Sequence, residues 1–305
     1  MARADFAPNA ATRAEATTLS ARLPGLVIAA RHVAMSVRHG VHGRRRAGPG
    51  ETFWQFRPFL SGEPAHRIDW RRSARESRAY VREREWEAAQ TLWLWFERSP
   101  SMDFRSELAT TRKIDRGAVL TLALADLAVR GGERAGLLGL TRPIAARDVI
   151  DRFAEALVAA ERRGAKHEAL PPAQPIASRA KVALIGDFLS SPDEIAGALS
   201  ALAAEGASGE VLMVADPIEE TFPYLGHTEF LMPGRNERFR APRAEDLRLG
   251  YLARLAEHRE QVKSLANSVG WGFALHRTDH SPAAALLALH ARLSAGVFIA
   301  SRGAA

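Results

Sequence analysis

The stretch TLWLWFERSPSMDF, residues 91–104, joins an apolar run to a short turn that carries an acid and two hydroxyl groups. An apolar run as short as TLWLWF, bounded by turn residues, is typical of a strand that is buried on both faces, as in parallel sheets. Glu97, Ser99 and Ser101 follow directly where this strand would end. Three interpretations are open: these side chains hold a metal ion, they are the remains of such a site, or they simply start a helix.

Apolar runs of similar length recur through the rest of the chain. Strands are expected at 91–96, 135–140, 182–185, 211–215 and 272–276. Apolar residues between them recur at helical spacing and predict helices from about 114 to the glycines at 131–132, after Ser191, and at about 246–268 and 282–294. Short apolar strands that alternate with helices predict an α/β fold with a doubly wound, mostly parallel, Rossmann-like sheet covered on both faces.

Three parts are expected along the chain. Residues 1–40 form an N-terminal tail and a helix, because the apolar rhythm over 19–37 fits a helix that is broken near Pro24 and Gly25. Residues 41–87 form a basic arm packed on the main domain, and its alternating stretch AYVREREWE (79–87) predicts a two-faced strand. Residues 88–300 form the α/β domain.

The composition is that of a globular protein with a sizeable core: 305 residues, of which 47% are hydrophobic and 25% charged. The absence of cysteine excludes disulfides, thiolate metal sites and cysteine nucleophiles, and it suits a reducing compartment, so we expect a cytoplasmic protein. The apolar segment LPGLVIAA (23–30) is shorter than the roughly 20 residues of a membrane-spanning helix. We therefore expect neither a signal peptide nor a membrane span.

Positive charge is concentrated in one segment of the chain. The formal net charge is +7, and residues 31–84 hold thirteen arginines against five acidic residues, a local excess of eight. The rest of the chain is therefore close to neutral. Such a patch is attracted alike to nucleic acid, to anionic lipid and to acidic protein surfaces.

Two strand ends of the expected sheet carry polar side chains. Glu97, Ser99 and Ser101 follow the first strand, and Asp187 follows VALIG (182–186). Ligands of parallel sheets bind outside the carboxyl ends of the strands, and oxygen ligands of this kind suit Mg²⁺. In the alternative interpretation, the serines satisfy backbone groups of the turn and Asp187 caps the helix that begins near Pro192.

The residues before and at the first strand end resemble known families. ERSPS (97–101) is similar to the Asp-x-Ser-x-Ser motif of the metal-ion-dependent adhesion site of von Willebrand factor A domains. More specifically, residues 48–87 with this strand end resemble the bacterial family known as domain of unknown function fifty-eight. The matching positions are Gly48, Gly50, Phe53, Arg57, Gly62, Arg67, Ile68, Asp69, Trp70, Ser73, Ala74, Arg75, Val81, Arg82, Glu83 and Glu85.

The resemblance covers roughly residues 23–293 and implies a von Willebrand factor A-like domain. Members of the family are found beside MoxR-type AAA+ ATPases and are thought to act in complex assembly or metal-centre maturation rather than as enzymes. The motif has aspartate where this chain has Glu97, whose extra methylene moves the carboxylate by about 1.5 Å. Because Mg²⁺ tolerates little departure from octahedral geometry, the resemblance implies a degenerate or weak metal site.

The RIDW motif, residues 67–70, has a structural and a functional interpretation. In the structural one, Arg67 pairs with Asp69 and Trp70 packs on the main domain, because Ile68 and Trp70 share one face of an extended chain. In the functional one, the motif grips a partner. We favour the structural interpretation and expect Trp70 to be a buried residue.

These observations favour a non-enzymatic interaction module that works with a MoxR-type AAA+ ATPase on a client protein. The sequence has no Gly-x-Ser-x-Gly elbow, phosphate loop, dinucleotide fingerprint or His-Glu-x-x-His helix. The outward arginines are the expected partner contacts: Arg44, Arg45, Arg46, Arg71 and Arg72. The alternative is that this arm binds nucleic acid or an anionic surface, in which case binding weakens steeply with salt.

Overall fold

A computed structural model describes residues 19–41, 53–59, 64–65, 68–74, 78–84, 90–163, 169–231, 233–234 and 237–300. The chain divides into two compact units. The main unit consists of residues 1–40 and 90–305, and the inserted unit consists of residues 41–89. The packing of the basic arm on the main domain stays a prediction.

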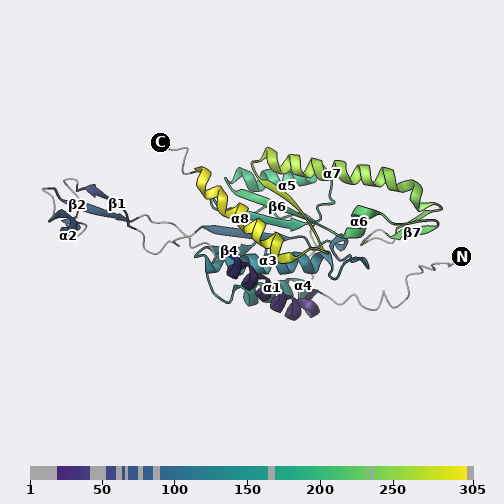
Figure 1. The fold of residues 1–305 in the computed structure, drawn as a ribbon, viewed down its shortest axis with the longest axis horizontal. Helices are drawn as coiled ribbons and strands as arrows, with labels where there is room; N and C mark the ends of the chain where they lie inside the picture. The colour runs from purple at the N-terminus through teal and green to yellow at the C-terminus, as the bar shows by residue number, and fades with distance from the viewer. Residues whose placement is uncertain are drawn as a thin grey trace. The chain divides into compact units, whose positions relative to one another are not determined.

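The main unit is built on a parallel sheet of five strands, shown in Figure 1. In spatial order they are β4 (Arg134–Leu137), β3 (Thr91–Phe96), β5 (Lys181–Gly186), β6 (Ser208–Ala215) and β9 (Gly272–Arg277). Neighbouring strands are parallel throughout this sheet. The prediction of a doubly wound parallel α/β fold is confirmed, and each of the five expected apolar runs contributes a strand.

Helices cover both faces of the sheet and enclose two hydrophobic cores (Figure 1). The first core packs under α1 (Leu19–Val41), α3 (Lys113–Arg130), α4 (Val149–Arg162) and α8 (Pro282–Ala300), and the second under α5 (Pro192–Ala204) and α7 (Arg248–Ser268). The central strand β3 contributes side chains to both cores. Leu94 packs in the first core, and Trp93 and Trp95 pack in the second. Alternate side chains of a strand point to opposite faces, so a strand covered on both sides must be apolar throughout.

The strand order creates a switch point at the middle of the sheet. From β3 the chain crosses to β4 on one side, and after α4 it returns to β5 on the other side of β3. The crossover helices therefore diverge at the carboxyl ends of β3 and β5, where open α/β sheets bind their ligands. Glu97 and Asp187 directly follow these two strands.

A hairpin that the sequence does not predict lies between β6 and α7 and forms a separate two-stranded sheet. After β6 the chain forms α6 (Pro217–Thr221), the antiparallel strands β7 (Thr228–Leu231) and β8 (Arg238–Ala241), the short 3₁₀ helix η4 (Ala244–Leu247) and then α7. These strands have only four residues each and are largely exposed, so they lack the apolar runs that mark the central strands.

The helix α1 is continuous through Pro24, so the expected break there is wrong. Pro24 is exposed, whereas Leu23, Ala30 and Ala34 are buried in the first core. Proline costs a helix one backbone hydrogen bond. Side-chain packing on the buried face outweighs that loss.

Among the described residues, no helix is both long enough and apolar enough to cross a bilayer.

The inserted unit pairs β1 (Phe53–Pro58) with β2 (Tyr80–Arg84), which confirms a strand within 79–87. Asp69 caps the single-turn helix α2 (Trp70–Ser73) by accepting the Arg72 N–H at 3.0 Å. Ser73 ties that turn to β2, because its Oγ accepts the Tyr80 N–H at 2.9 Å. Trp70 is 66% exposed within the inserted unit, so it is not buried by that unit itself, and its packing on the main domain stays a prediction. Ile68 and Trp70 do not share an extended face, because the chain turns into α2 between them.

Candidate functional site at the switch point

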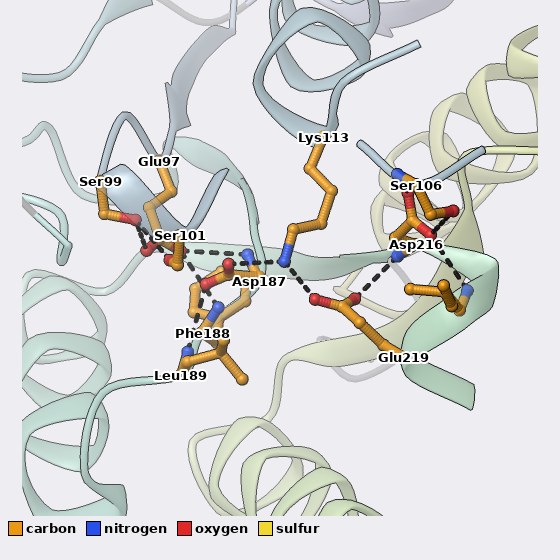
Figure 2. Close-up of polar contacts among 11 residues, drawn as sticks. Glu97, Ser99, Ser101, Ser106, Lys113, Asp187, Phe188, Leu189, Asp216 and Glu219 are labelled. Carbon is orange, nitrogen blue, oxygen red and sulfur yellow. Dashed lines mark hydrogen bonds and ion pairs between the residues drawn. The ribbon is translucent and has the colours of Figure 1, made fainter. Parts of the chain in front are cut away.

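The structure brings together the four residues that the sequence singled out at the strand ends (Figure 2). Ser99 Oγ lies 2.8 Å from Ser101 Oγ and donates to Glu97 Oε1 at 2.5 Å. Glu97 Oε2 accepts the N–H of Asp187 at 3.0 Å. Side chains after β3 and backbone after β5 therefore meet at one place, as parallel neighbouring strands require.

Glu97 fastens the turn that follows β5. Its Oε2 accepts a second backbone N–H, from Phe188 at 3.1 Å, and the side chain is only 1% exposed. Burial, followed by the charge of Asp187, raises the pKa of Glu97 to about 8, against the hydrogen bonds from Ser99 and Phe188. The carboxyl group is thus fully engaged by the protein.

The backbone around Glu97 is shaped to admit it. A side chain at Gly186 would place its Cβ 2.5 Å from Glu97 Oε2, so this position requires glycine for close approach. Phe188 has a φ of 49°, in the left-handed region that costs a non-glycine residue about 1–2 kcal/mol. Such strain persists where the surroundings fix it. Here the Glu97 carboxyl group holds the Phe188 N–H.

Lys113, which the sequence analysis did not single out, lies at the centre of the site. Its Nζ donates to Asp187 Oδ2 at 3.0 Å and to Glu219 Oε1 at 2.6 Å, and the residue is 1% exposed. Burial alone would lower the pKa of Lys113, but Asp187 and Glu219 raise it above its usual value. Lys113 is therefore a buried, charged ammonium group that joins β5, α3 and α6.

The polar contacts continue from Glu219 to the end of β6 (Figure 2). Glu219 Oε2 accepts the Asp216 N–H at 2.7 Å, and Asp216 caps α6 by accepting the Ile218 N–H at 3.0 Å. Asp216 also accepts the N–H of Ser106 at 2.9 Å and the Ser106 hydroxyl. One connected cluster thus spans the carboxyl ends of β3, β5 and β6.

Asp187 does not cap the following helix, contrary to the alternative interpretation. Ser191 caps α5 instead, in a capping box with Glu194, and its Oγ accepts the Glu194 N–H at 3.4 Å. Asp187 accepts the Leu189 N–H at 3.3 Å and pairs with Lys113. Its carboxylate is directed into the cluster.

The candidate ligands do not fit a Mg²⁺ ion. That ion needs about six oxygen ligands in octahedral geometry at about 2.0–2.1 Å. The Glu97 carboxyl oxygens already accept hydrogen bonds from two backbone N–H groups and a hydroxyl, and Asp187 is paired with the Lys113 ammonium group. In the described part of the chain, no three His, Asp or Glu side chains are grouped as metal ligands.

An apolar groove of about 660 Å³ opens beside the cluster, with Asp187 and Glu219 among its lining residues. We call it the aromatic groove; Phe222, Phe230, Phe239 and Tyr251 line it. Their rings form a continuous network, with centroid distances of 4.7 Å between Phe222 and Tyr251 and 5.8 Å between Phe222 and Phe230. The hairpin and α7, which sequence periodicity did not connect to the site, thus build its apolar part.

The arginines proposed as partner contacts fall in the inserted unit. Arg44, Arg45 and Arg46 lie outside the described residues. Arg71 is exposed on α2, and the Arg72 guanidinium lies 5.6 Å from the centre of the Tyr80 ring. Their role in partner binding stays a prediction.

His276, near the carboxyl end of β9, predicts a specific pH dependence. Burial, helped by Arg116 3.2 Å away and by His280, lowers the pKa of His276 from 6.5 to about 4, against the opposing charge of Asp279. Between these values the unfolded chain binds a proton that the native protein does not. The free energy of unfolding therefore falls as pH drops from 6.5 towards 4, by on the order of 3 kcal/mol for this residue.

His276→Gln removes this titration. Urea unfolding across that pH range should show a smaller loss of stability in the variant than in the wild type. Parallel curves for the two proteins would contradict a buried neutral imidazole.

Residues 55–261 match the family described as "Protein of unknown function DUF58". Relatives include "Uncharacterized protein Mb1516" of Mycobacterium bovis and "Uncharacterized protein Rv1480" of Mycobacterium tuberculosis, each 30% identical over 120 residues. That stretch is 39% of this chain and 37% of each relative, so the match covers well under half of either protein.

Two solved structures show a weaker likeness. One is the "conserved hypothetical protein BatB" from Bacteroides thetaiotaomicron, with a TM-score of 0.34 and 14% identity. The other is an "aerotolerance-related membrane protein" from Bacteroides fragilis, with a TM-score of 0.36 and 13% identity. Each match covers 68% of this chain and 99% of the other.

Proposed function

The chain belongs to the DUF58 family, and on that premise we propose that it is a non-enzymatic protein-interaction module. It acts with a MoxR-type AAA+ ATPase on a client protein, in complex assembly or in the maturation of a metal centre. The choice of this ATPase rests on the association expected from the family. The observation that carries the interaction role is the aromatic groove at the switch point.

The chemistry of the site supports binding rather than catalysis. The Ser99 hydroxyl is buried and donates to Glu97, and the Ser106 hydroxyl is buried and donates to Asp216. A nucleophile must be exposed to its substrate and activated by a base. Both hydroxyls are instead used in contacts that hold the strand ends together.

The groove predicts the chemistry of the partner segment. Its walls are mostly apolar, and Phe239 on its rim is 58% exposed, so a large apolar side chain of a partner would bury substantial area there. Arg254 also lines the groove, is exposed, and makes no hydrogen bond or ion pair to another described residue. The partner segment therefore combines a large apolar side chain with a carboxylate.

Binding to a purified MoxR-type ATPase encoded in the same genome tests this function. Phe239→Ser and Arg254→Glu should each weaken binding at least about tenfold in calorimetry, because each removes a contact at the groove. Both side chains are exposed, so melting temperatures should change little.

Arg162→Glu is the matched control. This exposed arginine ends α4, which leads towards the amino end of β5 and therefore lies at the opposite edge of the sheet. Equal binding by the wild type and both groove variants would refute the proposed face. An equal loss in the control would show that net charge, and not the groove, drives binding.

A further inference from the structure

The Lys113 ammonium group is a buried positive charge at the switch point, held between two carboxylates. It lies between Asp187, after β5, and Glu219, on α6, and is itself carried by the first turn of α3 (Figure 2). The Lys113 N–H is anchored to Phe104 O at 3.1 Å, which fixes the start of that helix. Three elements therefore converge on one buried positive charge.

The cluster is rich in carboxyl groups. Glu97, Asp187, Glu219 and Asp216 follow one another through shared contacts, and three of them are almost fully buried. Buried carboxylates are costly unless a cation or hydrogen-bond donors compensate them. Lys113 supplies the positive charge at the centre of this group, with two ion pairs of 3.0 and 2.6 Å.

The choice of lysine is informative in this chain. The sequence has 42 basic residues, and only four of them are lysines: Lys113, Lys166, Lys181 and Lys263. Lysine presents a compact point charge, whereas arginine presents a planar fork that needs more space. Lys113 is 1% exposed and lies between two carboxylates, so this position holds a compact cation in a chain whose basic residues are mostly arginine.

We infer that Lys113 is a built-in cation that takes the place of a divalent metal ion at the switch point. The strand-end site is therefore assembled without metal, and its partner face is the same in the presence and absence of Mg²⁺. This inference does not depend on the ATPase partner, because it concerns how the site is held together.

Thermal unfolding with and without added cations tests the inference. Millimolar MgCl₂, MnCl₂ or CaCl₂ should leave the melting temperature of the wild type unchanged relative to EDTA. Lys113→Ala removes the ammonium group and leaves space between Asp187 and Glu219, so its melting temperature should fall in EDTA. Millimolar Mn²⁺ or Ca²⁺ should then raise it by about 5 °C or more, as expected when the cation exceeds its dissociation constant about 100-fold.

Two controls separate a cation site from a structural ion pair. Lys113→Met removes the charge but fills the space, so added cations should not stabilise it. Lys181→Ala removes another buried lysine, at the amino end of β5, which pairs at 3.2 Å with the single carboxylate of Glu133. It should lose stability without recovering it in Mn²⁺.

Several outcomes would overturn the inference. A metal-dependent rise in the wild type, or Mn²⁺ binding to the wild type in electron paramagnetic resonance, would show that a metal ion still fits beside Lys113. A Lys113→Ala protein that responds to cations no more than Lys181→Ala would reduce Lys113 to an ordinary ion pair. Failure of Lys113→Ala to fold in either EDTA or Mn²⁺ would count equally against it.

Discussion

Replacing Glu97 with alanine should lower the free energy of unfolding by about 2–6 kcal/mol, the cost of orphaning two buried donors at about 1–3 kcal/mol each. The donors are the N–H groups of Asp187 and Phe188, which both point at Glu97 Oε2. The Phe188 backbone, in the left-handed region, also loses the group that holds it there. Urea unfolding followed by circular dichroism measures the loss.

Glu97→Gln is the control for this prediction. Its amide oxygen can accept the same two N–H groups, and its NH₂ can donate to Ser99, whose own hydroxyl then turns to Ser101. Most of the stability should therefore be retained. If the alanine variant were as stable as the wild type, the hydrogen bonds of Glu97 would not stabilise the turn after β5.

Replacing Trp271 with alanine should cost about 3–5 kcal/mol, the range for truncating a buried aromatic side chain. The indole is 2% exposed and its Nε1–H donates to Ala207 O at 3.1 Å. It lies against Gly209, where a Cβ would come within 2.5 Å of the ring. The variant should have a lower urea midpoint, and the orphaned Ala207 carbonyl adds to the loss.

Trp70→Ala is the matched control for Trp271. Trp70 is 66% exposed within the inserted unit, so the contacts of that unit alone predict a change in the free energy of unfolding of less than about 1 kcal/mol. A loss at Trp70 as large as at Trp271 would show that Trp70 packs on the main domain, as the sequence predicts. Trp271 lies at the amino edge of the sheet, opposite the groove. The folded fraction of Trp271→Ala should therefore still bind at the groove.

The central sheet could be predicted because its strands have no polar face. Leu94 and Trp95 point into opposite cores, so the sequence around them is apolar at every position and stands out from its surroundings. The hairpin of β7 and β8 gives no such signal, because exposed short strands tolerate any residue. The continuity of α1 through Pro24 was mispredicted for a related reason: packing of Leu23 in the core decides it, and local propensity does not.

The candidate site could be predicted only where it follows strand ends. Glu97 and Asp187 were found because parallel strands end at one edge, so their successors in sequence become neighbours in space. Lys113 begins a helix, and Glu219 lies in a short one after β6, at positions where charged residues are usually solvated. Only the scarcity of lysine in this arginine-rich chain marked Lys113, and that signal says nothing about its partners.

The course of the chain through the two units has a mechanical consequence. The helix α1 comes before the inserted unit in sequence, yet Leu23 and Val37 are buried in the core of the main unit, and Arg22 Nε lies 2.9 Å from Asp115 Oδ1. The inserted unit is consequently tethered to one body at both of its ends, which restricts its reach more than a single linker would. A single break of the chain between 41 and 90 would not release either piece, because side-chain contacts, and not the covalent connection, keep α1 on the sheet.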